Sequence, residues 1–307
     1  MINEQWSGSV AGSRFFKMLA YLLLVVLVVG CSRPVAQFTY SGEAKAPANI
    51  QFENQSEKAD SYEWDFGDGK TSEEAAPTHR FRKSGIYDVQ LRAFREGKSR
   101  VTRQQVVIAP PDRCLVEVET PYGNMLVELF SATPQHQDNF TKLVEDNFFD
   151  SLLFHRVIQE FMIQGGDPNS KGAGANQMLG SGGPGYTIPA EFVDSLIHIK
   201  GALSAARTGD QVNPEKRSSG SQFYIVQGKT YTDRELDIIE SRKNMRYTSA
   251  QRELYKTVGG TPFLDRDYTV FGQVIEGLEV IDAIAAQPTD GRDRPRENVW
   301  MKMTFIK

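Results

Sequence analysis

The chain has 307 residues, which is enough for about two domains of common size. Its formal net charge is −4, with 24% charged and 40% hydrophobic residues. This balance is ordinary for globular domains, and it argues against a nucleic-acid-binding protein, because such a protein needs a basic surface.

The N-terminus predicts an export signal. Arg14 and Lys17 precede the apolar run Met18–Val29, which is shorter than the about 20 residues that span a bilayer. Gly30 and Cys31 end this run, and the pattern resembles the lipobox of bacterial lipoproteins. The resemblance implies that the signal peptide is removed and that Cys31 becomes the lipidated first residue.

Residues 1–30 are therefore predicted as the signal peptide and residues 31–35 as a tether. A lipid on Cys31 would anchor the chain to a membrane, since each buried CH₂ contributes about 0.8 kcal/mol. The alternative is an uncleaved short anchor with an incidental cysteine. No acidic run follows Cys31, which favours the periplasmic side of the inner or outer membrane. Cys114 is left without a disulfide partner, and we expect it to be a small buried residue rather than a reactive thiol.

Residues 36–109 show the two-residue period of short strands, with Tyr62, Trp64 and Phe66 alternating with polar residues. Frequent turns between such runs predict a small β-sandwich. The runs Tyr62–Gly69 and Gly85–Val89 resemble a PKD-type domain of the immunoglobulin-like class. That resemblance implies an extracytoplasmic spacer or adhesive module, with a glycan or a protein as its partner.

Two aspartates of this region allow two interpretations. Asp68-Gly69 lies between strand-like runs and predicts a hairpin turn, because glycine accepts positive φ. Asp65 and Asp68 are either turn-forming residues or ligands of a calcium ion. We prefer the turn, because aspartate is common in turns.

Pro110 and Pro111 end this pattern, and residues 110–113 are predicted as a linker. In residues 114–307, a hairpin is expected from Cys114–Thr120 and Met125–Leu129. Thr133 is the predicted N-cap of a first helix.

A second helix is expected over Leu278–Ile284, from its apolar pattern. Residues 229–260 form a charged stretch that favours helix, with Thr232 and Thr248 as plausible caps. This stretch predicts a surface insertion of one or two helices.

The most informative stretch surrounds Glu160. As a strand it would place Arg156 and Glu160 on one side, and a bend near Glu160 would reset the alternation. Four side chains would then share one patch: Arg156, Phe161, Met162 and Gln164. A cation, two large apolar groups and an amide suit a peptide groove better than a core. Ordinary core packing is the competing interpretation for Phe161 and Met162, and equally for Tyr224 and Leu264.

This stretch resembles the cyclophilin signature, Phe-His-Arg followed by Phe-Met-x-Gln-Gly-Gly-Asp. Two further blocks match in order, and they comprise Gly201–Ala206 with Gly220–Ile225, and Phe263–Asp265 with Tyr268–Gly272. The resemblance implies a mainly β chain, in which the β-sandwich precedes an eight-stranded antiparallel barrel capped by two helices. It also implies peptidyl-prolyl cis/trans isomerase activity.

The resemblance makes Arg156 the catalytic residue and Gln222 its buttress. It implies that substrate contacts come from Phe161, Met162, Gln164, Ala206, Arg207, Gln222, Tyr224, Phe263, Leu264 and Tyr268. Phe263 and Tyr268 replace a tryptophan and a histidine that many members carry, which argues against tight binding of cyclosporin.

The predicted substrates are proline-containing segments of exported proteins, whose folding the enzyme would assist. The alternative is a non-catalytic proline-peptide binding or chaperone module. We expect no cofactor and no metal, since the four histidines show no metal-ligand spacing. The glycine-rich residues 172–185 lack the lysine and helix of a phosphate-binding loop, and we expect a flexible loop there.

Overall fold

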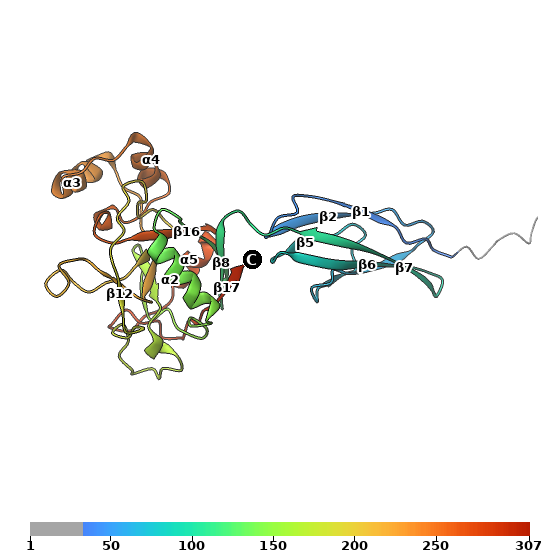
Figure 1. Ribbon diagram of the computed structural model, residues 1–307, viewed down its shortest axis with the longest axis horizontal. Coiled ribbons are helices and arrows are strands. Elements are labelled where there is room, and N and C mark those ends of the chain that lie inside the picture. Colours follow the sequence, from blue (N-terminus) through green and yellow to red (C-terminus); the bar gives the residue numbers. More distant parts are fainter. Residues whose placement is uncertain (1–32) are drawn as a thin grey trace, which may run out of the picture. The chain divides into compact units, whose positions relative to one another are not determined.

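The computed structural model describes residues 33–307, which fold as two compact units (Figure 1). The first unit ends at Ile108, and the second runs from Ala109 to Lys307. The predicted signal peptide and Cys31 lie outside the described residues. Among the residues that the structure describes, no helix is both long and apolar enough to cross a membrane.

The first unit packs two antiparallel sheets face to face. Their strand orders are β1-β2-β5 and β4-β3-β6-β7. The strands are β1 Phe38–Ser41, β2 Ala48–Asn54, β3 Ser61–Asp65, β4 Thr71–Ser72, β5 Thr78–Phe81, β6 Gly85–Arg95 and β7 Lys98–Ile108. The Trp64 ring lies 5.1 Å from that of Phe38 and 5.4 Å from that of Phe52, both on the facing sheet. Aromatic rings from both sheets thus fill one core, and the predicted β-sandwich is confirmed.

The two aspartates of this unit hold turns. The Asp65 carboxylate accepts a hydrogen bond from the backbone N–H of Gly67 at 2.9 Å. The Asp68 carboxylate accepts one from the N–H of Lys70 at 3.0 Å, and Gly69 has a φ of +85°. These bonds within the chain favour the turn interpretation over the calcium site.

The second unit is built on an eight-stranded antiparallel sheet of order β10-β11-β15-β13-β16-β9-β8-β17. The strands are β8 Cys114–Thr120, β9 Gly123–Leu129, β10 Arg156–Ile158, β11 Met162–Gly165, β13 Ala202–Ala205, β15 Phe223–Val226, β16 Val270–Glu276 and β17 Lys302–Ile306. Backbone bonds of 2.9 Å from Phe154 N–H to Val299 O and from Met301 N–H to Leu152 O join the residues that precede β10 and β17. The two edges of the sheet therefore meet as a barrel, as the sequence predicts.

Two helices complete the barrel core. α2 spans Pro134–Glu145 and α5 spans Leu278–Ala285. Phe140 of α2 and Ile281 of α5 are buried in the same apolar cluster as the inward side chains of the strands. Each helix is therefore fixed by burial of one apolar stripe.

The N-terminus of α2 differs from the sequence prediction in its cap. Thr133 is the N-cap residue, but its hydroxyl donates to the carbonyl of Phe130 instead of capping the helix. The Glu191 carboxylate accepts the backbone N–H groups of Gln135 and His136, at 3.1 and 3.0 Å. A full negative charge interacts better than a hydroxyl with the positive end of the helix, which explains the replacement.

The insertion forms α3, Asp233–Lys243, and α4, Ser249–Thr257, which lie together at one edge of the second unit (Figure 1). Thr232 and Thr248 are the N-caps, and each forms a capping box with the third residue of its helix. The sequence predicted one or two helices in this insertion, and the structure has two. The remaining elements are the short strands β12 Thr187–Ile188 and β14 Ser218–Ser219, and the 3₁₀ turns η1 Pro168–Ser170 and η2 Pro262–Leu264.

Candidate active site

Strand register assembles the site. Arg156 of β10 lies opposite Gln164 of β11, which lies opposite Tyr224 of β15. Residues in register project from the same face of a sheet, so these three side chains are neighbours. The residues between them, such as Ile163 and Ile225, face the barrel core. One alternating pattern thus builds the core on one face and the site on the other.

The bend predicted near Glu160 is present. Glu160 has a φ of +60°, a left-handed backbone conformation that residues other than glycine rarely adopt. Its N–H donates to the Gln227 side chain at 2.6 Å, and the N–H of Phe161 donates to the Ile158 carbonyl at 3.1 Å. This tight turn brings Phe161 to the same side as Arg156.

A cavity of about 180 Å³ lies on this face, and we call it the slot. It is lined by Arg156, Phe161, Met162, Gln164, Ala206, Arg207, Tyr224, Leu264 and Tyr268. Its volume is below the 300–1,000 Å³ typical of pockets for drug-sized ligands, which suits one small ring. The patch of Arg156, Phe161, Met162 and Gln164 predicted from the sequence is therefore present.

Two predicted site residues, Phe263 and Ala206, differ from the others in what they offer a substrate. Phe263 is 44% exposed and outside the slot lining, although its ring lies 5.8 Å from that of Phe161. The N–H of Ala206 donates to the Gln222 carbonyl, and its own carbonyl accepts from Ser219. The N–H of Ala206 is therefore unavailable to a peptide, because a sheet-like bond inside the protein already uses it.

Arg156 stays accessible at the rim of the slot, with a side chain that is 42% exposed. Its Nη1 donates to Oε1 of Gln164 at 3.4 Å, and its Nε lies 3.5 Å from Oδ2 of Asp293. A half-exposed ion pair of this length contributes little, typically about 0–1 kcal/mol. The guanidinium is thus oriented by two side chains without being buried by either.

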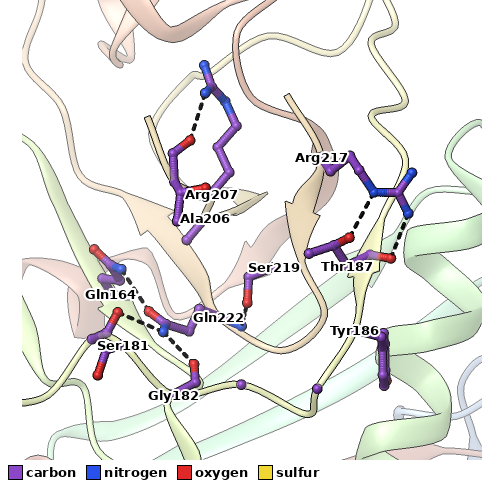
Figure 2. Close-up of a pocket in the computed structure, with 14 residues that line it drawn as sticks. Gln164, Ser181, Gly182, Tyr186, Thr187, Ala206, Arg207, Arg217, Ser219 and Gln222 are labelled. Atoms are coloured by element: carbon purple, nitrogen blue, oxygen red, sulfur yellow. Dashed lines mark hydrogen bonds between the residues drawn. The ribbon is translucent and has the colours of Figure 1, made fainter. Parts of the chain in front are cut away.

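Gln222 reaches Arg156 through Gln164. Oε1 of Gln222 accepts from Nε2 of Gln164 at 3.2 Å, and its own Nε2 donates to the carbonyls of Gly180 and Gly182 at 2.9 and 2.7 Å (Figure 2). The bond partners fix the orientation of both amides, since each amide nitrogen meets only acceptors. The predicted buttress is therefore an indirect one.

A larger cavity of about 710 Å³, which we call the groove, shares Gln164, Ala206 and Arg207 with the slot. Its other walls are mostly main chain of residues 180–187 (Figure 2). On the far side, Arg217 donates to the hydroxyl and carbonyl of Thr187, at 2.8 and 3.1 Å.

The glycine-rich loop that borders the groove is tied down at several points, which the sequence analysis did not foresee. The fully buried Asp167 carboxylate accepts the N–H groups of Asn169, Gly180 and Gly182. A Cβ at Gly182 would lie 2.1 Å from an Asp167 oxygen, so only glycine fits there. Arg294, which is 7% exposed, donates to the carbonyls of residues 173–175 and 177.

Aromatic contacts set the end of the slot opposite Arg156. The rings of Tyr224 and Tyr268 pack edge to face with centres 5.8 Å apart. The Arg207 guanidinium lies 4.6 Å above the Tyr268 ring and donates from Nε to the Asp267 carbonyl at 2.7 Å. Its Nη1 also pairs with Oδ1 of Asp210 at 2.6 Å. Arg207 is therefore fixed against Tyr268 and the main chain of the rim.

Burial keeps several titratable groups near the site neutral. Desolvation raises the pKa of Tyr224 well above its usual value and lowers the pKa values of His136 and His155. Cys114 is only partly buried, whereas the sequence predicted a buried residue, but this burial still raises the pKa of its thiol, which agrees with an inert side chain. The residues that the structure describes contain no cluster of three or more metal-ligating side chains.

Two features had no sequence signal. Asp293 pairs with Arg156 but lies far from it in the sequence, and no motif connects the two residues. His198 and Asp265 form a buried pair with Nδ1 to Oδ1 at 2.7 Å, although they lie far apart in the sequence. Only the fold brings such residues together.

Comparison with known proteins matches residues 115–305 to the family described as cyclophilin type peptidyl-prolyl cis-trans isomerase/CLD, and residues 31–108 to the PKD domain. A putative peptidyl-prolyl cis-trans isomerase of Staphylococcus epidermidis is 35% identical over 193 residues, which cover 62% of this chain and 91% of that protein.

A putative bifunctional phosphatase/peptidyl-prolyl cis-trans isomerase of Streptococcus pyogenes is 37% identical over 189 residues. The match covers 60% of this chain but spans only 37% of the length of that relative. A cyclophilin type isomerase structure from Cryptosporidium parvum matches 64% of this chain and 98% of its own, with 24% identity and a TM-score of 0.46.

Proposed function

The chain belongs to the family of cyclophilin-type peptidyl-prolyl cis-trans isomerases, and on this premise we propose that it isomerises X-Pro bonds of exported proteins with Arg156 as the catalytic residue. The observation that carries the assignment is the half-exposed guanidinium at the rim of an apolar slot. The slot takes the proline ring, and the guanidinium faces the bond that rotates.

The chemistry needs only a well-placed donor. A peptide C–N bond resists rotation by about 18–20 kcal/mol because of its partial double-bond character. When the bond twists, conjugation is lost and the prolyl nitrogen gains a lone pair. A donor that meets this lone pair only in the twisted state lowers the barrier selectively. Arginine suits the role because it is always charged and its donors form a rigid fork.

The other residues of the site would contact either the proline ring or the peptide on either side of it. Phe161, Met162, Tyr224 and Leu264 would hold the ring, since they supply the apolar walls of the slot. Gln164 and the main chain at Arg207 would bind the flanking peptide, which would continue into the groove. Gln164 can do so while it orients Arg156, because its carbonyl oxygen has two lone pairs.

The direct test is turnover of a short X-Pro peptide by the full chain in a protease-coupled assay. Arg156→Ala should reduce kcat/KM by about 10²–10³-fold, the usual loss when one transition-state donor is removed. Arg156→Lys should recover only part of it, because an ammonium lacks the fork. Unchanged turnover in Arg156→Ala would refute the assigned role.

We further propose that Cys31 carries a lipid and holds the enzyme on the periplasmic side of a membrane, with the PKD domain binding a glycan or a protein there. The support is the apolar run that ends at Gly30-Cys31. Cys31→Ser should move the chain from the membrane fraction to the soluble fraction of cells. An unchanged membrane fraction would refute the lipid anchor.

A further inference from the structure

The helical insertion buries one of its sides against the rest of the second unit. α3 and α4 enclose an apolar cluster of Ile197, Leu236, Tyr247 and Tyr255. Tyr247 is 7% exposed and Tyr255 is fully buried. Buried tyrosines need a partner for the hydroxyl, so the partner shows what the insertion is attached to.

Both hydroxyls meet the same carboxylate oxygen. Oδ2 of Asp265 lies 2.7 Å from the Tyr247 hydroxyl and 2.6 Å from the Tyr255 hydroxyl. Asp265 is 3% exposed and directly follows Leu264, a wall of the slot. A buried carboxylate is stable only when donors surround it, and the insertion supplies two of them.

The other oxygen of Asp265 leads to a second wall of the slot. Oδ1 accepts the backbone N–H of His198 at 2.9 Å and lies 2.7 Å from Nδ1 of the same residue. Nε2 of His198 lies 3.0 Å from the Tyr224 hydroxyl. An ionised carboxylate only accepts, so Nδ1 of His198 donates to Asp265, and Nε2 of the same ring carries the hydrogen-bond chain on to the Tyr224 hydroxyl.

The insertion also holds the main chain that carries Leu264. The Tyr247 hydroxyl lies 3.0 Å from the Pro262 carbonyl at the start of η2. Nζ of Lys243, the last residue of α3, donates to the Asp265 carbonyl at 2.6 Å. The two contacts lie on either side of Leu264, so the insertion fixes the slot wall from both directions.

The tyrosines keep their protons at any physiological pH. Burial, and then the charge of Asp265, raise the pKa values of Tyr247 and Tyr255 far above the usual range. Both hydroxyls therefore remain donors.

We propose that Tyr247 and Tyr255 are positioning residues of the isomerase: through Asp265 and His198 they fix the ring of Tyr224, and through η2 they fix Leu264. The insertion is thus a support that sets the width of the slot. This inference rests on the proposed function, since it treats the slot as the site of the proline ring.

The test compares three versions of the full chain in the X-Pro assay: the wild type, the double variant Tyr247→Phe/Tyr255→Phe, and Tyr231→Phe. The double variant should lose about tenfold in kcat/KM, because two hydrogen bonds to a buried charge are removed while the rings stay. Tyr231 packs edge to face on Tyr255 in the same cluster, whereas the tyrosine hydroxyls that bind Asp265 are those of Tyr247 and Tyr255. Tyr231→Phe is therefore the matched control and should keep wild-type activity.

A double-mutant cycle with Tyr224→Phe distinguishes a positioning role from a merely structural one. Tyr224→Phe removes the hydroxyl that ends the hydrogen-bond chain from the insertion to the slot. The loss caused by the two tyrosine changes should shrink from about tenfold to about twofold in that background. An equal loss in both backgrounds, or a double variant that melts earlier but keeps wild-type kcat/KM, would overturn the inference.

Two further outcomes are distinguishable. If near-ultraviolet circular dichroism shows that the double variant does not fold, the two single variants replace it, since each leaves one hydroxyl on Asp265. Each single variant should then lose less than tenfold in kcat/KM, but more than Tyr231→Phe loses. A wild type without isomerase activity would refute the proposed function itself, whatever the tyrosine variants do.

Discussion

The slot and the groove adjoin, but they are built by different means. The slot takes its walls from side chains that strand register places on one face of the barrel. The groove takes its walls from irregular main chain, which single polar side chains such as Asp167 and Gln222 hold in place. A wall that strand pairing positions should keep its shape when one side chain is truncated. A wall that one side chain holds by hydrogen bonds should shift when that side chain is removed.

The proposed catalytic group lies on the border between the two regions. Arg156 lines the slot, and its hydrogen bond to Gln164 connects it to Gln222 and the loop of the groove. We therefore expect changes in the slot to act mainly on substrate binding, and changes at the border to act on the rate of the bound substrate.

The largest effect of the three changes that follow is expected in the slot. Phe161→Ala removes a ring that lines the slot and that we propose contacts the proline, and it should raise KM by about 10–100-fold, since burial of a phenylalanine is worth roughly 1.5–3 kcal/mol. kcat should change little. Steady-state kinetics on the X-Pro peptide measure both constants.

The matched control is Phe263→Ala, which removes an exposed ring outside the slot lining. It should change KM by less than about threefold, a change below 1 kcal/mol. Equal effects of the two variants would mean that the slot extends to Phe263, as the sequence analysis supposed.

An intermediate effect is expected at the border. Gln222→Ala leaves the Gln164 amide and the carbonyls of Gly180 and Gly182 without their partner, so kcat should fall by about tenfold with little change in KM. Gln177→Ala is the control, because this side chain bonds the Asn169 carbonyl in the same loop without contacting Gln164. A normal kcat in Gln222→Ala would show that the border does not position Arg156.

The smallest effect is expected at the ion pair of Arg156. Asp293→Asn should lower kcat/KM by at most about fivefold, the range of a half-exposed pair. Salt screens such pairs, so the difference from the wild type should shrink as ionic strength rises. A loss that salt does not change would assign Asp293 another role.

The sequence predicted the parts of the site that local patterns encode. The alternation around Glu160 and the cyclophilin-like blocks identified Arg156, Phe161, Met162 and Gln164, and all four line the slot. The caps Thr232 and Thr248 located both helices of the insertion. These predictions held because capping and strand alternation depend on residues a few positions apart.

The parts that failed depend on long-range contacts. Thr133 was the expected cap of α2, but Glu191, distant in sequence, supplies the carboxylate instead. Burial would raise the pKa of Glu191, but its bonds from His136 and the helix N–H groups outweigh burial and lower it, so the cap stays charged. The link from Tyr255 through Asp265 to His198 likewise has no local pattern, because its members come from three separate segments.

The most direct test measures binding and exchange in one sample. NMR line shapes of an X-Pro peptide, titrated with the full chain, report both the Kd and the rate of cis/trans exchange on the protein. For Arg156→Ala we predict a Kd within about threefold of the wild type and an exchange rate lower by about 100-fold or more, because the guanidinium acts only on the twisted bond. If exchange persisted at the wild-type rate, or fell only as far as binding fell, the slot would be a binding module and the account of Arg156 would be wrong.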